Sequence, residues 1–335
     1  MKKVFVGLSG GVDSSVTAAL LKKQGYDVTG VYIKGWYPSW IRCSWRESRR
    51  DAMRVCAKLD IPFLTLDLEK EYKKEVVDYF LEEYKKGNTP NPDIMCNKYI
   101  KFGSFFDFAM GNGADFVATG HYAISKDSKL YRGKDNEKDQ SYFLWTISKE
   151  KLPKITFPLG EYQKKETRKL AKEFGLPTSE KKDSQGICFL EDISMEEFLK
   201  YYFPPKEGNV LDPEGNVIGT HEGSIYYTIG QRRGFTTSQN MQAFVISKDM
   251  EKNTITVSEK RPERNSGDIL LHKENWITVP EEGKEYTFQS RYRQKPTRCR
   301  ISGNKLEILE KSDTPTSGQS IVVYAGDECL GGGII

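Results

Sequence analysis

The first 120 residues alternate between short apolar runs and longer segments in which apolar residues recur at helical spacing. The short runs lie at residues 4–8, 28–33, 62–68 and 116–119. Three intervening segments have one apolar helical face each, around residues 12–20, 52–59 and 72–84, and Gly25 and Gly87 are placed to end the first and the third. Strands separated by helix-length segments predict an α/β domain with a doubly wound parallel sheet.

The pattern changes after about residue 200, where Pro204 and Pro205 interrupt the chain. Short alternating runs follow at residues 243–247, 254–258 and 321–324, and turn signals such as those of residues 212–216 separate them. This period of two predicts two small all-β domains, with a boundary near residue 270.

The composition fits a globular protein, with 37% hydrophobic and 29% charged residues in a chain of 335. No apolar run approaches the length of a membrane span, and a glycine-rich turn follows the apolar residues of the N-terminus where a signal peptide would have a cleavage site. We therefore expect a cytoplasmic protein without a membrane partner. The six cysteines show no CxxC spacing, so neither zinc nor a disulfide scaffold is expected. A net charge of +4 is too small to indicate nucleic-acid binding by itself.

A glycine- and serine-rich loop, residues 7–15 (GLSGGVDSS), connects the first predicted strand to the first helix. Adjacent glycines let backbone N–H groups approach an anion, and the helix N-terminus adds further donors. Ser9, Ser14 and Ser15 offer hydroxyls, and Asp13 can help to hold Mg²⁺ between phosphates. The loop lacks the Walker GK[ST] ending and the GxGxxG pattern. An ordinary glycine-rich turn is the alternative, but the full string favours a phosphate-binding loop.

Two cysteines lie in segments that suggest chemistry. Cys96 follows the proline turn TPNPDIM just before a helical pattern, where a helix dipole would lower the pKa of a thiol, and Asp93 is one turn away. Cys188 lies in DSQGICF, a polar, glycine-containing stretch typical of a loop, downstream of Lys181 and Lys182. For each of them, a buried structural cysteine is the alternative.

A basic stretch runs through residues 286–306, which contain no acidic residue. Its cations are Arg291, Arg293, Lys295, Arg298, Arg300 and Lys305. Alternating arginines on a strand would project from one face and follow a phosphate backbone, with Tyr292 available to stack on a base. The alternative is a solvated edge strand. Of the three histidines, His121 at a strand end is the functional candidate, whereas His221 and His272 are not.

Five strings occur in order along the chain: SGGVDSS, TPNPDIMCNKYIKFG, ATGHYA, KDQSYFLW and DSQGICF. Together they resemble the bacterial tRNA-specific 2-thiouridylase (tRNA-uridine 2-sulfurtransferase) family of the ATP pyrophosphatase, or PP-loop, superfamily, over essentially the whole chain. The resemblance implies a PP-loop catalytic domain over residues 1–202, a central β domain over 203–268 and a tRNA-contacting C-terminal β-barrel over 269–335.

The resemblance also implies roles for individual residues. The ATP site would comprise Gly7, Leu8, Ser9, Gly10, Gly11, Val12, Asp13, Ser14, Ile33 and Gly120. The tRNA site would comprise Asn91, Pro92, Asp93, His121, Lys138, Asp139, Gln140, Arg291, Tyr292 and Gln319, the first three at the target base. Asp93 would be the acid/base, Cys96 the nucleophile and Cys188 the persulfide carrier, and the two cysteines would form a transient disulfide.

The reaction implied is ATP-dependent 2-thiolation of the wobble uridine of tRNA, by adenylation of the 2-oxygen and sulfur transfer from the persulfide. ATP with Mg²⁺ is expected, with no tightly bound metal or organic cofactor, and a cysteine desulfurase or sulfur-relay protein would supply the sulfur. Residues 35–47 (GWYPSWIRCSWRE) depart from the acidic segment usual in the family, and Ile33 stands where many members have methionine. The alternatives are another PP-loop enzyme that adenylates a small molecule, and a non-catalytic RNA-binding or nucleotide-sensing module.

Overall fold

The computed structural model describes residues 1–40, 45–182, 194–237, 242–264 and 267–335. Within them, no helix is long and apolar enough to cross a membrane. The N-terminal domain is built on a five-stranded sheet, all parallel, in the order β3-β2-β1-β4-β7. Its strands are β1 (Lys3–Gly7), β2 (Asp27–Lys34), β3 (Phe63–Asp67), β4 (Phe116–Ala118) and β7 (Ile155–Thr156). The predicted doubly wound α/β sheet is confirmed, and its strand order reverses between β1 and β4, where such sheets open a crevice.

Alternate residues of β1 face opposite helical layers, as the pleat of a strand requires. Val4 and Val6 pack against α1 (Val12–Lys23) and α2 (Trp45–Leu59). Phe5 lies in a separate core with residues of η2 (Cys96–Ser104) and α6 (Phe105–Gly111). A further helix, α7 (Lys164–Glu173), packs on the outer side of α1. The phosphate-loop helix is therefore held from two sides.

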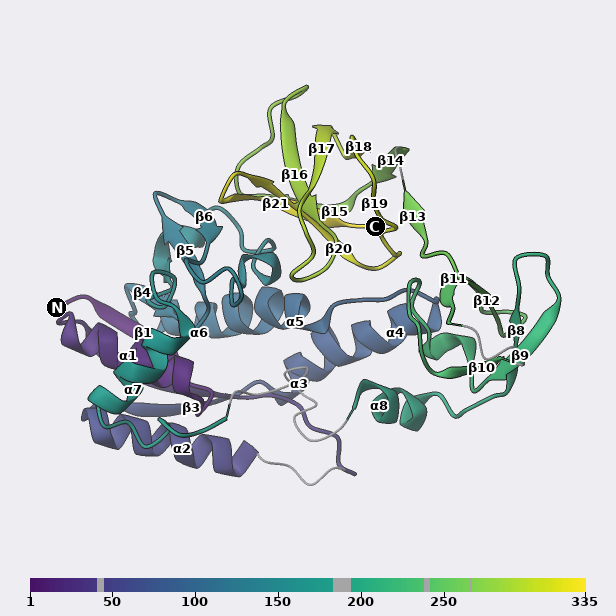
Figure 1. Ribbon diagram of the computed structural model, residues 1–335. Helices are drawn as coiled ribbons and strands as arrows, with labels where there is room; N and C mark the ends of the chain where they lie inside the picture. The colour runs from purple at the N-terminus through teal and green to yellow at the C-terminus, as the bar shows by residue number, and fades with distance from the viewer. Residues whose placement is uncertain (41–44, 183–193, 238–241, 265–266) are drawn as a thin grey trace.

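Two long helical stretches cross the domain between β3 and β4 (Figure 1). The first comprises α3 (Glu69–Tyr72), the π-helical η1 (Lys73–Asp78) and α4 (Tyr79–Lys85), and Gly87 follows it with a φ of +81°. The second comprises α5 (Pro92–Met95), η2 and α6, and η2 is also π-helical. Short 3₁₀ turns lie at Ser141–Phe143 (η3) and Leu152–Lys154 (η4).

The C-terminal domain is a β-barrel that the N-terminal domain helps to build. Its sheet has the order β14-β18-β17-β16-β20-β21-β6-β5, and β15 also pairs with β21. Seven strands come from the domain itself: β14 (Gly267–Leu270), β15 (His272–Trp276), β16 (Glu285–Gln289), β17 (Thr297–Ser302), β18 (Lys305–Ile308), β20 (Ser320–Ala325) and β21 (Glu328–Ile334). The other two are the hairpin β5 (Ala123–Lys126) and β6 (Lys129–Arg132), and β6 pairs antiparallel with β21. The two domains therefore share one sheet.

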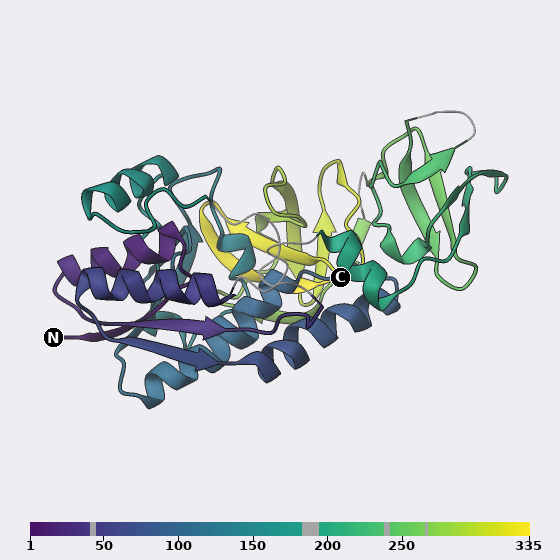
Figure 2. The same ribbon diagram turned by 90° about the horizontal axis from the view of Figure 1, so that it is seen from below.

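The central domain follows α8 (Met195–Tyr202), which begins with a capping box formed by Ser194 and Glu197. Its five-stranded sheet has the order β10-β9-β8-β12-β11. The strands are β8 (Gly208–Leu211), β9 (Val217–His221), β10 (Phe235–Thr237), β11 (Phe244–Asp249) and β12 (Thr254–Ser258), and the 3₁₀ turn η5 (Ser224–Tyr226) lies between β9 and β10. A short ladder of β13 (Glu263–Arg264) with β19 (Ser312–Asp313) leads to the barrel. Figure 2 shows the central domain at the end of the molecule far from the N-terminus. Two small β domains therefore follow the α/β domain, as the sequence predicts.

Candidate active site

The phosphate loop turns sharply at Gly10, between β1 and α1. Gly10 has a φ of +77°, and a Cβ at this position would lie 2.2 Å from the carbonyl oxygen of Ser48, so only glycine fits. Gly11 is the N-cap of α1, and no side chain of the described residues caps it. The hydroxyls of Ser9 and Ser14 lie 3.2 Å apart, beside the backbone N–H groups at the start of α1. Uncapped N–H donors beside two hydroxyls are an arrangement that can bind an anion, as the sequence leads us to expect.

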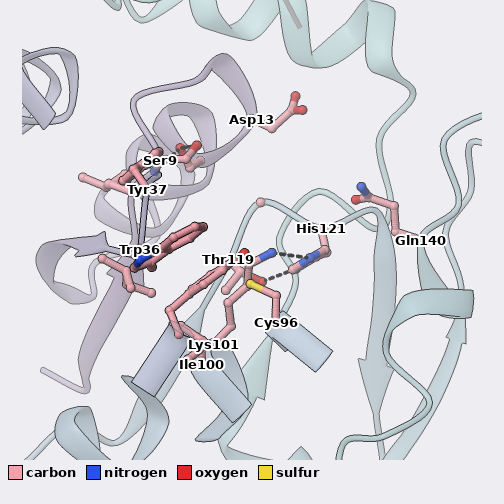
Figure 3. A pocket seen from close by; sticks show the side chains of 17 residues that line it. Ser9, Asp13, Trp36, Tyr37, Cys96, Ile100, Lys101, Thr119, His121 and Gln140 are labelled. Carbon is pink, nitrogen blue, oxygen red and sulfur yellow. Dashed lines mark hydrogen bonds between the residues drawn. The ribbon is translucent and has the colours of Figure 1, made fainter. Parts of the chain in front are cut away.

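A cavity of about 250 Å³ opens at the carboxyl ends of β1 and β4, where the strand order reverses (Figure 3). Ten of the predicted site residues line it: Gly7, Leu8, Ser9, Asp13, Ser14, Ile33, Cys96, Gly120, His121 and Gln140. Gly120 approaches the phosphate loop closely, because a Cβ there would lie 2.8 Å from the backbone nitrogen of Ser14. The cavity therefore brings one predicted cysteine and the phosphate loop to the same space.

Asp13 is paired with a lysine that the sequence did not single out. Lys164 Nζ donates to both of its carboxylate oxygens, at 2.7 and 2.8 Å, and the Tyr122 hydroxyl donates to one of them at 2.9 Å. Lys164 is the first residue of α7, and its side chain is 14% exposed. A cation thus lies at the edge of the phosphate loop.

Cys96 does not lie at a helix N-terminus, contrary to the prediction. The helix begins four residues earlier, because Pro92 fits its first position and the Asn91 side chain accepts hydrogen bonds from the N–H groups of Asp93 and Ile94. The Cys96 N–H already donates to the carbonyls of Asp93 and Pro92. Since the dipole effect fades within the first turn, it acts only weakly on Cys96, which is 2% exposed.

The wall of the cavity beside Cys96 holds a chain of three polar side chains (Figure 3). Lys101 Nζ lies 3.4 Å from His121 Nε2, and His121 Nδ1 lies 2.7 Å from the Thr119 hydroxyl. Burial, together with the charge of Lys101, holds the pKa of His121 well below its ordinary value of 6.5. A neutral His121 that accepts a hydrogen bond from the Lys101 ammonium at Nε2 carries its proton on Nδ1 and donates to Thr119.

Aromatic residues from the segment after β2 form the opposite wall, and the sequence left their role open. Trp36 and Tyr37 line the cavity together with Tyr72. The Trp36 ring also packs edge-on against Phe198 of α8, with the ring centroids 6.5 Å apart. The tryptophan-rich stretch after Gly35 therefore links the cavity to the helix that follows residues 183–193.

Cys188 lies outside the described residues, and so does Cys43. The predicted disulfide between Cys96 and Cys188 accordingly stays a prediction. The chain leading toward Cys188 is anchored near the phosphate loop: the Thr178 hydroxyl donates to that of Ser15 at 3.0 Å, and Lys181 pairs with Asp51 of α2 at 2.8 Å. Cys188 thus follows a segment fixed beside α1 and α2.

The other described cysteines are buried structural residues. Burial raises the pKa of Cys56, Cys299 and Cys329 to about 12 in each case, so their thiols stay protonated at neutral pH. Cys299 lies in β17 and Cys329 in β21. Among the described residues, no group of histidine, cysteine and acidic side chains is arranged to hold a metal ion.

Comparison with known protein families gives three matches along the chain: the tRNA methyl transferase HUP domain at residues 2–192, the tRNA methyl transferase PRC-barrel domain at 196–259 and the aminomethyltransferase β-barrel domain at 266–335. The tRNA-specific 2-thiouridylase MnmA of Streptococcus thermophilus (strain ATCC BAA-491 / LMD-9) is 45% identical over 353 residues, which cover 99% of this chain and 95% of that protein. The protein of the same name from Halalkalibacterium halodurans is 46% identical over 349 residues, covering 99% and 94%. The chain belongs to the tRNA-specific 2-thiouridylase family.

The predicted family and enzyme class are thereby confirmed. Among solved structures, the U34-tRNA thiolase NcsA from Methanococcus maripaludis matches at 20% identity with a TM-score of 0.37, covering 61% of this chain and 67% of that one.

Several predicted tRNA-binding residues of this 2-thiouridylase-family chain have internal contacts. The Asp139 carboxylate is buried and accepts hydrogen bonds from Arg132, Ser141 and the Gly133 N–H. Gln140 Oε1 accepts from the Tyr122 N–H, although Gln140 also lines the cavity. Lys138 precedes this turn, and its N–H donates to the Asp135 carbonyl. These contacts hold the segment around Asp139 in place between the cavity and the barrel.

The basic stretch is not one strand stripe, contrary to the prediction. Arg291 and Arg293 lie in the loop between β16 and β17, whereas Arg298 and Arg300 lie on β17. The acidic residues that the local sequence lacks come from neighbouring segments. They form the ion pairs Arg298–Glu310, Arg298–Glu285, Arg300–Glu285, Arg300–Glu307 and Lys305–Asp268. The cations on the strands are therefore paired with acidic residues. The loop arginines, Arg291 and Arg293, instead line a separate groove together with Lys295.

Arg291 joins domains. Its guanidinium donates to the Ile229 carbonyl of the central domain at 3.0 Å and to the Thr316 hydroxyl of the barrel at 3.4 Å. Nearby, the Thr89 N–H donates to the Ser317 carbonyl at 2.8 Å. Gln319 supports the same barrel loop by accepting from the Thr316 N–H, and Tyr292 packs on Phe143 with ring centroids 4.7 Å apart. Three domains thus meet at the turn that leads to Asn91.

Proposed function

We propose that the protein catalyses ATP-dependent 2-thiolation of the wobble uridine of tRNA. One observation carries the proposal: the phosphate loop, which follows β1, and Cys96, which begins η2, line the same cavity. An activated oxygen and its replacing sulfur must meet at one carbon of the base, so the two sites have to be adjacent. The family membership supplies the class of substrate, and the names of its relatives describe a tRNA-specific 2-thiouridylase.

The first step would be adenylation. ATP would bind with its pyrophosphate at the loop from Gly7 to Ser14, and the flipped-out base would present its 2-oxygen to the α-phosphate. A bond forms between this oxygen and the α-phosphorus while the bond to pyrophosphate breaks. Asp13 would help to hold the Mg²⁺ that accompanies ATP, which would supply positive charge against the phosphates. Asp93, one turn before Cys96, would act as the acid/base on the base.

The second step would be sulfur transfer. A persulfide on Cys188, loaded by a cysteine desulfurase or a relay protein, would deliver sulfur to the activated carbon. The carbon–oxygen bond breaks, and AMP leaves with the bonding electrons. With Cys96 attacking the Cys188 persulfide, a Cys96–Cys188 disulfide results, and an external reductant must reopen it before the next cycle. The groove that holds Arg293 and Lys295 would contact the phosphate backbone of the tRNA.

Pyrophosphate release measured with and without tRNA tests the proposal. We expect release only when a tRNA with an unmodified wobble uridine is present, and loss of release when that uridine is replaced by another base. Release that does not depend on tRNA would favour a PP-loop enzyme that adenylates a small molecule. Binding of tRNA with no release under any condition would favour a non-catalytic RNA-binding module.

A further inference from the structure

The helix that carries Cys96 departs from α-helical geometry at the cavity. In η2 the pattern is π-helical, and the Phe105 N–H at its end donates to the Ile100 carbonyl, five residues earlier. In an α-helix of about 3.6 residues per turn, residue i+5 points about 140° away from residue i. The wider π-helical turn brings residue i+5 back over residue i, and such turns recur at functional sites. Cys96 and Lys101 accordingly line the same cavity (Figure 3).

Lys101 supplies the cavity with a positive charge. Among the described residues that line it, Lys101 is the one lysine or arginine. Its Nζ lies 3.4 Å from His121 Nε2, and His121 is fixed in turn by the Thr119 hydroxyl at 2.7 Å. His121 and Thr119 flank Gly120, whose backbone lies against Ser14 of the phosphate loop. The ammonium is therefore held between Cys96 and the loop.

We propose that Lys101 binds the α-phosphate, both of ATP during adenylation and of AMP as sulfur displaces it. The proposal rests on the proposed function. The phosphate loop would hold the pyrophosphate end, and the sulfur from the Cys96 side must reach the carbon whose oxygen bears the adenylyl group. The α-phosphate consequently lies between the loop and Cys96, beside Lys101. No proton moves from Lys101: its ammonium stabilises the negative charge that grows on the non-bridging oxygens and then on the leaving AMP. His121 is a positioning residue for it.

Lys101→Met tests this role, with Lys98→Met as the matched control. Lys98 lies on the same π-helical segment, is half-buried and does not line the cavity. We expect tRNA-dependent pyrophosphate release by Lys101→Met to fall by roughly 100-fold or more, the usual loss for one donor to a developing charge. The KM for ATP should change by less than about 3-fold, because the loop still holds the pyrophosphate end. Lys98→Met should keep the parent rate.

A second measurement separates chemistry from structure. Lys101→Ala assayed with ethylammonium should regain part of the lost rate, which a purely structural lysine would not allow, and Lys101→Gln replaces Lys101→Met if the latter does not fold. Pyrophosphate release by Lys101→Met at the parent rate, or an equal loss in Lys98→Met, would overturn the role of Lys101. A parent protein that binds ATP and tRNA yet releases no pyrophosphate would instead overturn the proposed function, and the two failures are thus distinguished.

Discussion

Lys164 Nζ lies 2.7 and 2.8 Å from the two carboxylate oxygens of Asp13, although 151 residues separate them in the chain. The ion pair neutralises Asp13 at the mouth of the phosphate loop, and the Tyr122 hydroxyl holds the carboxylate in place. When ATP and Mg²⁺ are bound, Asp13 and Lys164 would exchange partners, the carboxylate turning to the metal and the ammonium to a phosphate. Lys164 is therefore a candidate for the ATP site that the sequence did not reveal.

Lys164→Met should raise the KM for ATP roughly tenfold, about 1.4 kcal/mol, because it removes a cation and leaves an uncompensated carboxylate beside the phosphates. Lys165→Met, at the next and exposed position of α7, should keep the parent value. Steady-state pyrophosphate release over a range of ATP concentrations measures the KM of both variants.

Asp13→Ala and Ser9→Ala should abolish ATP turnover without unfolding the protein. An unchanged KM in Lys164→Met, or parental turnover in Asp13→Ala, would refute the assignment of this loop edge to phosphate.

The two predicted catalytic cysteines should fail in different ways. Replacing either Cys96 or Cys188 with serine should eliminate thiolation, since a hydroxyl neither carries a persulfide nor forms the resolving disulfide. Adenylation should survive, because it depends on the phosphate loop and Asp93. Labelled sulfur from a desulfurase should load Cys96→Ser and not Cys188→Ser. Label on the Cys188→Ser protein instead would reverse the roles, and full activity of both variants would rule out the thiol mechanism.

Arg291 and Lys295 should affect tRNA binding for different reasons. Arg291→Ala should lower both the melting temperature and the affinity for tRNA, because the guanidinium joins the central domain to the barrel. Lys295→Ala, at an exposed groove position, should leave the melting temperature unchanged, weaken tRNA binding and reduce the salt slope by about one unit. ATP affinity should be unaffected in both. Thermal unfolding measures the melting temperatures, and tRNA titrations over a series of salt concentrations measure the affinities. An unaltered tRNA affinity in Lys295→Ala would exclude its groove from the tRNA interface.

The buried His121 makes stability depend on pH. Burial, with the nearby charge of Lys101, holds its folded pKa well below the ordinary 6.5, so below about pH 6.5 the unfolded chain binds a proton that the folded chain does not. The stability that comes from keeping His121 neutral is fully present above about pH 6.5, and it is lost as the pH falls toward the folded pKa. The melting temperature should fall between about pH 7.5 and 5.5. The fall in melting temperature should be smaller in His121→Asn than in the parent protein. An equal fall in the two proteins would show that His121 is protonated in the folded protein.

The amino-acid sequence by itself determined the local features of this protein. The spacing of apolar residues decided the strands and helices of the parallel sheet, because each element buries one face and its period is set by its own geometry. The glycine–serine string after β1 likewise predicted the phosphate loop, since its φ values and N–H groups belong to consecutive residues. The proline turn at Asn91 indicated a helix start, and it placed that start one turn too late.

Only the tertiary structure decided which distant pieces meet. The hairpin β5–β6 joins the barrel through β21, about 200 residues onward, and Lys164 reaches Asp13 from a helix whose own sequence is ordinary. The basic stretch looked unpaired because its acidic partners, such as Glu310 and Asp268, lie outside it in sequence. Lys101 lines the cavity because η2 is π-helical, and α-helical periodicity would have turned it away. Such contacts depend on packing between elements, and the spacing of residues within any one element does not encode them.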